Sequence, residues 1–266
     1  MGADRRQRAV IEVHDLAKRF VRGRGRGACA VTAVDGVSWQ AADARITGLL
    51  GPNGAGKTTT LRLIAGLLAP ERGGVRVDGI DVAAHAAAAR ARLGVLSDAR
   101  GLYPRLTARE NIVYYARLHG LADAAAHARV ELLAATLEMR DLLDRRTDGF
   151  SQGERMKTAL ARALVHDPPN IVLDEPTNGL DVLATRALRA ALLRLRDEAG
   201  KCIVVSTHIM QEVERLADHV VVMSQGRTVA EGTVAGLRER AGEGDFEAAF
   251  VRLAYPGAAP GGGRGR

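Results

Sequence analysis

The pattern of apolar and polar positions predicts a chain in which strands and helices alternate. Residues 10–50 are predicted to form short strands, because "VIEVHDL" alternates and "ARITGLLG" is an apolar run that ends in glycine. "GGVRVDG", residues 73–79, is predicted as another short strand closed by an Asp-Gly turn. Three β-branched runs, at 171–173, 202–206 and 220–223, are apolar on both faces, which is typical of buried parallel strands.

Other segments have the helical period. From about 81 to 148 the composition favours helices, and "TARENIVYYARLHG" and "AHARVELLAATLEMRDLL" are amphipathic, which predicts an inserted helical lobe. A later segment, "ATRALRAALLRLRDEAG", carries Leu188, Leu192 and Leu195 on one face and is predicted to end at Gly200.

Composition excludes several classes of protein. The chain has 266 residues and is 47% apolar, so it can bury a core, and its apolar runs are far shorter than the roughly 18 residues that span a membrane. The N-terminus lacks the apolar segment of a signal peptide. Cys29 and Cys202 cannot build a disulfide framework and are predicted to be reduced thiols without a catalytic role.

The net charge of +7 raises the question of an anionic partner. Most of this charge is arginine scattered beside acidic residues, and only 3% of the chain is aromatic, so we predict a solvated basic surface and no nucleic-acid partner. Proximity to anionic lipid headgroups is the second interpretation. "RGRGRG", residues 22–27, is predicted to be a flexible basic surface loop, and the Gly/Arg-rich C-terminal tail is predicted to be disordered.

"GPNGAGKT", residues 51–58, fits G-x-x-x-x-G-K-[ST] and lies between an apolar strand and a helical run. Such glycines let backbone N–H groups surround phosphate oxygens at a helix N-terminus. Lys57 is predicted to contact the β- and γ-phosphates and the Thr58 hydroxyl to bind Mg²⁺, whereas a glycine-rich turn that binds nothing is the disfavoured alternative. The residues predicted to contact the nucleotide here are Gly51, Asn53, Gly54, Ala55, Gly56, Lys57, Thr58 and Thr59.

Polar residues follow two of the predicted buried strands. Asp174 ends the "IVL" strand and suits the Mg²⁺ carboxylate, and Glu175 comes next, where a carboxylate can accept a proton from an attacking water. His208, in "STHIM", lies at the end of the following strand and is predicted to hydrogen-bond the γ-phosphate. Glu175, His208 and Lys57 are therefore the predicted catalytic residues, and a structural histidine is the alternative for His208.

"FSQGER", residues 150–155, has two interpretations. Ser151 and Glu154 are three residues apart, as in a capping box that begins a helix. The free N–H groups of such a helix start can also face an anion. A purely structural cap and a part of the active site are therefore both consistent with this segment.

Taken in order, "GPNGAGKT", "FSQGER", "IVLDEP", "NGLD" and "STH" resemble the ATP-binding cassette (ABC) ATPases, and the resemblance extends from about residue 10 to 235. "SDARGLYPRLTARENI" and "FSQGER" are most similar to the exporter (ABC-2) branch that includes bacterial sodium-efflux pumps. "FSQGE" departs from the family's usual "LSGGQ" at Gln152 and Glu154. We therefore expect an ATPase that binds ATP and Mg²⁺.

The resemblance also implies a fold and its division. We expect an α/β P-loop NTPase fold with a mostly parallel sheet, a small antiparallel β subdomain and an inserted helical subdomain at about 81–155. The nucleotide-binding domain would cover 1–240, and 241–266 would form a C-terminal extension.

Further site residues follow only from the resemblance. Ser151, Gly153 and Asp181 match positions that contact ATP across a dimer, and Phe20 lies where the family has an aromatic residue that stacks on adenine. An ordinary core aromatic residue is the competing interpretation of Phe20. Asp98 replaces the family's glutamine that helps to hold Mg²⁺ and the attacking water, and its carboxylate can serve a metal.

The resemblance implies a dimer of cassettes, most simply a homodimer, on the cytoplasmic face of the cell membrane. An integral membrane permease would bind the helical lobe and carry the transport path, and the substrate is not encoded in this chain. A soluble ABC ATPase that acts on ribosomes or nucleic acid is the alternative, but the stretch between Lys57 and Asp174 is too short for its long coiled coil. A small-molecule kinase would lack the "FSQGER" and "NGLD" motifs.

Overall fold

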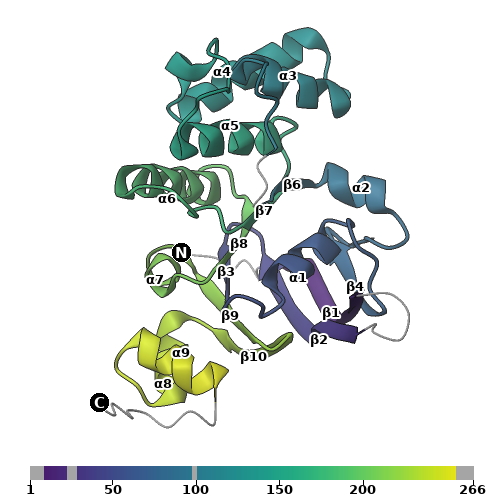
Figure 1. Ribbon diagram of the computed structural model, residues 1–266, viewed down its shortest axis with the longest axis vertical. Coiled ribbons are helices and arrows are strands. Elements are labelled where there is room, and N and C mark those ends of the chain that lie inside the picture. The colour runs from purple at the N-terminus through teal and green to yellow at the C-terminus, as the bar shows by residue number, and fades with distance from the viewer. Residues whose placement is uncertain (1–8, 23–28, 98–100, 256–266) are drawn as a thin grey trace, which may run out of the picture.

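The computed structural model describes residues 9–22, 29–97 and 101–255, and they form two sheets, a helical lobe and a C-terminal helical pair (Figure 1). The strands are β1 (Ala9–Arg22), β2 (Cys29–Ala42), β3 (Ile46–Leu50), β4 (Arg72–Val77), β5 (Ile80–Asp81), β6 (Leu93–Leu96), β7 (Asn170–Asp174), β8 (Cys202–Thr207), β9 (His219–Ser224) and β10 (Arg227–Gly232). The helices are α1 (Lys57–Ile64), α2 (Ala86–Ala91), α3 (Ala108–Leu118), α4 (Asp123–Thr136), the 3₁₀ helix η2 (Arg140–Leu142), α5 (Gln152–Leu164), α6 (Val182–Asp197), α7 (Met210–Leu216), α8 (Val234–Ala241) and α9 (Phe246–Ala254).

The larger sheet has the strand order β10-β9-β3-β8-β7-β6, and all its pairs are parallel except β10 with β9. The three β-branched runs form β7, β8 and β9, whose side chains are almost all buried. The prediction of buried parallel strands is therefore confirmed, as is the α/β fold class.

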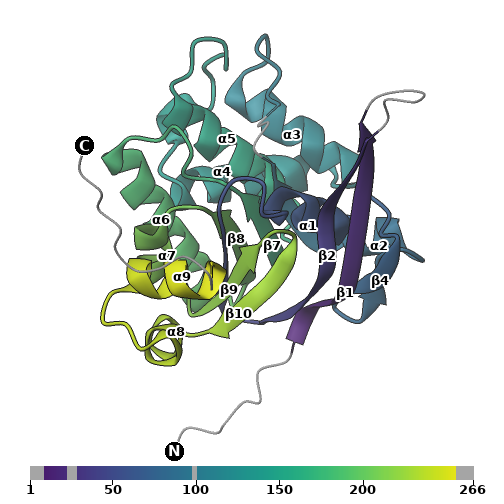
Figure 2. The ribbon, with the colours of Figure 1, turned by 60° about the horizontal axis from the view of Figure 1, so that its bottom comes forward.

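The smaller sheet, of order β2-β1-β4-β5, is antiparallel and lies beside α1 (Figure 2). The prediction of short strands across 10–50 is wrong for β1 and β2, which are 14 residues each. They pair along their whole length in a register that is interrupted by bulges. Local periodicity breaks at each bulge, so the sequence pattern shortened these strands.

Three apolar clusters hold the elements together. One joins the helical lobe to α6 and one face of the larger sheet, the second lies between the two sheets around α1, and the third packs α8 and α9 against β9 and β10. Leu188, Leu192 and Leu195 of α6 are buried in the first cluster, which confirms the predicted apolar face. Within the three described stretches, no helix is long and apolar enough to cross a membrane.

The helical lobe, at the top of Figure 1, consists of α3, α4 and α5. The segment 93–96 lies inside the range for which the sequence predicted helices, but it forms β6 and pairs in parallel with β7. Gly94 lets this short strand lie close to α5, because a Cβ there would press against the carbonyl oxygen of Ala163 and the ring of Pro168. A contact between residues so far apart in the chain leaves no periodic signal. The limits of the helical subdomain and of the C-terminal extension stay predictions.

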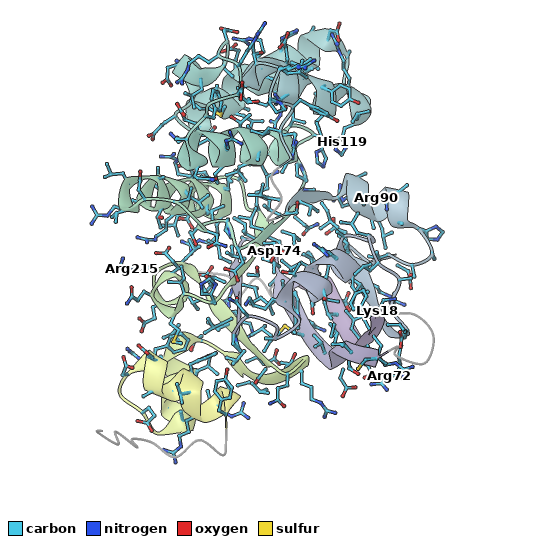
Figure 3. The ribbon with its side chains drawn as sticks, viewed as in Figure 1. Lys18, Arg72, Arg90, His119, Asp174 and Arg215 are labelled. Carbon is cyan, nitrogen blue, oxygen red and sulfur yellow. The ribbon has the colours of Figure 1, made fainter. Side chains whose placement is uncertain are left out.

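A stacked pair of histidines connects the helical lobe with the larger sheet. The rings of His119, at the end of α3, and His166, after α5, are 3.7 Å apart and nearly parallel. His166 Nε2 donates to the carbonyl oxygen of Leu93 in β6, 3.2 Å away. Figure 3 shows His119 at the side of the lobe that faces the core. Burial, together with the neighbouring His119, lowers the pKa of His166 to about 4.

The part of β4 that lies opposite a bulge in β1 requires glycine. Gly73 has φ +79°, and a Cβ there would collide with the carbonyl oxygens of His14 and Asp15. We predict that Gly73→Ala lowers the free energy of unfolding by at least about 2 kcal/mol, because both the backbone conformation and the space exclude a side chain. Urea denaturation measures the change. Gly74→Ala is the control, because a Cβ at Gly74 meets nothing within 4 Å, and equal losses in the two variants would refute the explanation.

The half-buried His166 predicts a pH dependence of stability. The unfolded chain binds a proton at His166 near pH 6.5, whereas the folded chain, in which this pKa is lowered, binds it near pH 4. Acidification across this interval therefore favours unfolding. As the pH is lowered from 6.5 to about 4, the free energy of unfolding measured with urea should decrease less for His166→Gln than for the unchanged protein. His85→Gln, at an exposed position, should keep the original slope. An unchanged slope for His166→Gln would contradict the prediction.

Candidate functional site

The phosphate loop connects the end of β3 with the start of α1, as predicted. Two glycines allow its path: a Cβ on Gly51 would collide with the carbonyl oxygen of Met223, and one on Gly56 with that of Ala33. Gly56 precedes α1 with φ +97° and makes no side-chain cap, and the first turn holds no acidic residue. The first N–H groups and the positive end of the helix dipole are thus available to an anion.

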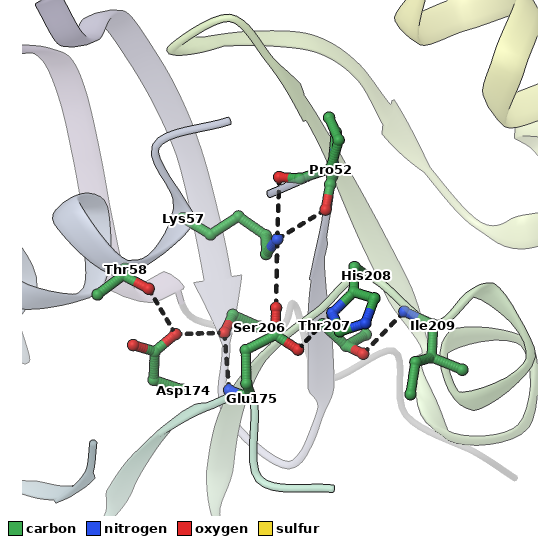
Figure 4. Close-up of polar contacts among 10 residues, drawn as sticks. Pro52, Lys57, Thr58, Asp174, Glu175, Ser206, Thr207, His208 and Ile209 are labelled. Carbon is green, nitrogen blue, oxygen red and sulfur yellow. Dashed lines mark hydrogen bonds and ion pairs between the residues drawn. The ribbon is translucent and has the colours of Figure 1, made fainter. Parts of the chain in front are cut away.

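Lys57, the first residue of α1, is 5% exposed. Its Nζ donates to the carbonyl oxygens of Gly51 at 2.6 Å and Pro52 at 3.2 Å, and it lies 3.2 Å from Glu175 Oε1 (Figure 4). A buried ammonium needs such partners, since burial without them would favour its neutral form. These contacts place Nζ between the phosphate loop and Glu175. A phosphate bound there would compete with Glu175 for the ammonium group.

The two predicted metal ligands that the structure describes are adjacent. Asp174, the last residue of β7, is buried near the middle of the molecule (Figure 3), and its Oδ1 accepts a hydrogen bond of 3.1 Å from the Thr58 hydroxyl of α1. Hydroxyl and carboxylate oxygens suit Mg²⁺, which keeps several waters or phosphate oxygens as further ligands. In the described part of the chain no group of three or more His, Cys, Asp or Glu residues could hold a metal.

Glu175 and His208 meet at the same edge of the sheet. His208 Nδ1 lies 2.9 Å from Glu175 Oε2, and the other oxygen, Oε1, faces Lys57. Glu175 has φ +46°, a left-handed conformation that is uncommon for a residue other than glycine. The predicted catalytic residues Lys57, Glu175 and His208 are thus brought together.

The sequence analysis missed Ser206, which lies among these residues. Its hydroxyl donates to Asp174 Oδ1 at 2.6 Å and accepts the backbone N–H of Glu175 at 3.0 Å. A signal was present in "CIVVST", where Ser206 is a hydroxyl residue at the predicted end of an aliphatic strand. Its pairing with Asp174 depends on the register of β7 and β8, which the sequence does not show.

The Ser151–Glu154 capping box is present at the start of α5. Ser151 Oγ accepts the N–H of Glu154 at 3.2 Å, and Glu154 Oε2 accepts the N–H of Ser151 at 2.7 Å. Arg145, which the sequence analysis also missed, donates to Glu154 Oε1 at 2.8 Å and lies over the ring of Phe150. The hydrogen bond from Ser151 and the charge of Arg145 lower the pKa of Glu154.

A second helix begins beside this box. Asp181 caps α6 by accepting the N–H of Ala184 at 2.7 Å, and a Cβ on Gly153 would lie only 3.2 Å from the Ala184 Cβ. Ser151, Gly153 and Asp181 line one cavity of about 530 Å³. The predicted site residues thus fall into two groups, one around the phosphate loop and one around this cavity.

Two predicted residues lie away from these groups or outside the described part. The side chain of Phe20 is 36% exposed near the end of β1, so it is not a core aromatic residue, and Lys18 Nζ lies 5.9 Å from its ring centroid. Its contact with adenine stays a prediction. Asp98 lies outside the described residues, and its role as a ligand of Mg²⁺ or water also stays a prediction.

The phosphate loop, the carboxylates at the adjacent strand end and the mostly parallel sheet together define a P-loop nucleoside triphosphatase. Comparison with known proteins gives the family, since the family model described as ABC transporter matches residues 34–178. The ABC transporter ATP-binding protein NatA of Bacillus subtilis (strain 168) is 41% identical over 243 residues, which cover 91% of this chain and 97% of that protein.

A further relative is the Nod factor export ATP-binding protein I of Paraburkholderia xenovorans (strain LB400), 42% identical over 77% of this chain and 67% of its own. A solved ATP-binding subunit of an ABC transporter superposes with a TM-score of 0.79 at 30% identity, over 92% of this chain and 99% of that chain. A dimeric bacterial ABC transporter cassette, 24% identical, has the same fold with a TM-score of 0.76 over 84% of this chain and 98% of that chain.

The chain belongs to the ABC transporter family. It is an ATP-binding subunit of an ABC transporter and an ATPase, as the sequence analysis predicted.

Proposed function

We propose that two copies of this chain close over two ATP molecules and that their hydrolysis powers export through a separate membrane subunit. The observation that carries the dimer is the division of the site residues into two groups within one chain. Ser151, Gly153 and Asp181 share a cavity that the phosphate loop does not line. In the proposed dimer, the Ser151 group of one copy binds the γ-phosphate held by Lys57 of the other.

Exposed apolar side chains support this dimer. Val182 and Leu183, which follow Asp181 at the start of α6, are 71% and 76% exposed. Leu183 also lines the cavity with Ser151. Exposed apolar residues beside a polar binding site are typical of an interface between proteins. A second copy at this surface would bury them and exclude water from both nucleotides.

In each site, the N-terminus of α1 and Lys57 bind the phosphates of ATP. Thr58 and Asp174 would hold Mg²⁺, because their oxygens are adjacent and of the type that this ion prefers. When bound, the ion would neutralise negative charge that develops on the phosphate oxygens during transfer.

Glu175 accepts the proton of the attacking water, and His208 orients this carboxylate through its contact with Oε2. When a γ-phosphate takes over the ammonium of Lys57, Oε1 of Glu175 loses its cationic partner and is free to accept a hydrogen bond from the attacking water. Phosphate binding and activation of the base are coupled in this way through one lysine.

We propose export as the direction of transport because a relative is named for it, the Nod factor export ATP-binding protein I. The sodium ion stays a prediction of the sequence resemblance. We place the chain at the cytoplasmic face of the membrane, bound to a permease through the helical lobe. This lobe exposes Tyr103, Tyr114, Leu118 and Leu132, and the rings of Tyr103 and Tyr114 are in edge-to-face contact.

The shared site is tested by trapping the dimer. Glu175→Gln should bind ATP but hydrolyse it at least about a hundredfold more slowly, because the proton acceptor is lost. Gel filtration should then show an ATP-bound dimer. Adding Ser151→Ala to Glu175→Gln should weaken this dimer but leave ATP binding to the monomer unchanged, since Ser151 belongs to the partner's site.

Glu198→Gln, at an exposed position after α6, is the control and should stay active without trapping a dimer. A Glu175→Gln protein that stays monomeric with saturating ATP would contradict the shared site. Weaker ATP binding to the monomer of the double variant would show that Ser151 acts within its own chain.

The membrane partner is tested by isolating the tagged chain from its host after nuclease and high-salt treatment, which removes nonspecific contacts of a basic protein. We expect recovery from the membrane fraction with a multi-span protein. Tyr114→Glu should reduce this recovery and leave basal ATPase activity unchanged, because it places a charge on the apolar surface of the lobe. Val251→Glu, at an exposed position of α9, is the matched control. Recovery only with ribosomes or nucleic acid would refute the transporter assignment.

A further inference from the structure

Ser206 is a fully buried hydroxyl residue in β8, at 0% exposure. The four residues before it in the strand are Cys202, Ile203, Val204 and Val205, which are all buried. A hydroxyl group in such surroundings is unfavourable unless it forms hydrogen bonds. Ser206 forms two, and both go to residues of the proposed catalytic site.

The direction of each hydrogen bond is fixed by chemistry. The carboxylate of Asp174 can only accept, so the single hydroxyl proton of Ser206 goes to Oδ1, 2.6 Å away. The backbone N–H of Glu175 can only donate, so it bonds the lone pair of Ser206 Oγ at 3.0 Å. Hydrogen bonds in such a chain strengthen one another. The hydroxyl therefore connects the proposed Mg²⁺ ligand with the backbone of the proposed base, as Figure 4 shows.

The backbone of Glu175 needs this support. Its φ of +46° is disfavoured for a residue with a Cβ. The N–H of Glu175 is held both by Ser206 Oγ and by the carbonyl oxygen of Ser206 at 3.2 Å. This conformation directs the Glu175 carboxylate between Lys57 and His208. Without the hydroxyl, the N–H of Glu175 keeps only its hydrogen bond to the carbonyl oxygen of Ser206. The Asp174 carboxylate loses the hydrogen bond that the hydroxyl donates to it.

We propose that Ser206 is a positioning residue of the ATPase, which couples the Mg²⁺ site at Asp174 to the placement of Glu175. This inference rests on the proposed roles of Asp174 and Glu175. Both hydrogen bonds of the Ser206 hydroxyl described above go to protein atoms, one at Asp174 and one at Glu175. The hydroxyl that donates to the proposed Mg²⁺ ligand Asp174 also holds the backbone of the proposed base, so the positions of these two residues depend on the same group.

The experiment compares Ser206→Ala with Ser206→Cys, which keeps the shape of serine but donates more weakly. We expect Ser206→Ala to lower kcat at saturating Mg²⁺ about tenfold or more, as for the loss of a hydrogen bond to a charged group. The Mg²⁺ concentration that gives half-maximal activity should rise several-fold. Binding of a fluorescent ATP analogue in EDTA should stay within about twofold of the unchanged protein. The kcat and the half-maximal Mg²⁺ concentration of Ser206→Cys should lie between those of Ser206→Ala and those of the unchanged protein.

Ser224→Ala is the matched control, because Ser224 is also a buried serine at the end of a strand of the same sheet. If Ser206→Ala only lowers the melting temperature, as a loss of packing would, and leaves kcat and the Mg²⁺ dependence within about twofold, the inference is overturned. Should Ser206→Ala fail to fold, Ser206→Cys decides by the same two readouts.

The outcome is separable from the proposed function through Glu175→Gln. An inactive Glu175→Gln together with a normal Ser206→Ala refutes the role of Ser206 alone. An active Glu175→Gln refutes the assignment of the base, on which the role of Ser206 depends.

Discussion

Parallel pairing of β3, β8 and β7 through their backbone hydrogen bonds is the constraint on which the ATP site depends. In this register Leu50 lies beside Thr207, and Asp174 lies beside Ser206, so three strands end at one edge of the sheet. Each strand end delivers one part of the site: the phosphate loop, the carboxylates, and the serine and histidine of β8. Parallel strands need crossover connections, and the helices in these connections cover the faces of the sheet.

The positive charge of Lys57 at this edge is compensated by a small number of neighbouring groups. The ammonium of Lys57 is shared between two carbonyl oxygens and Glu175, which makes its burial tolerable. Each of these contacts is one that a phosphate can replace. In the proposed mechanism, binding of a nucleotide therefore exchanges the partners of the Lys57 ammonium. The same exchange leaves Glu175 with His208 as its remaining side-chain contact among those described above.

The helical lobe carries the second group of proposed site residues, and its capping box has a structural and a proposed functional role. The family's usual glutamine is replaced by Glu154, which could place an unbalanced negative charge near a partner's phosphate. Arg145 removes this problem by pairing with Glu154 Oε1, while Oε2 holds the N–H of Ser151. The box thus stays neutral overall, and the Ser151 hydroxyl and the first N–H groups of α5 keep their orientation. We therefore propose that the Ser151–Glu154 box is both the cap of α5 and a part of the active site.

The sequence by itself determined the features that depend on neighbouring residues: the phosphate loop with Lys57, the strand that ends at Asp174, the capping box at Ser151 and the apolar face of α6. Each rests on spacing within one turn or one strand. Only the tertiary structure decided that residues 93–96 join the sheet as β6 and that Ser206 connects Asp174 with Glu175. These depend on which strands pair and in which register, and such contacts join residues far apart in the chain, so no local pattern records them.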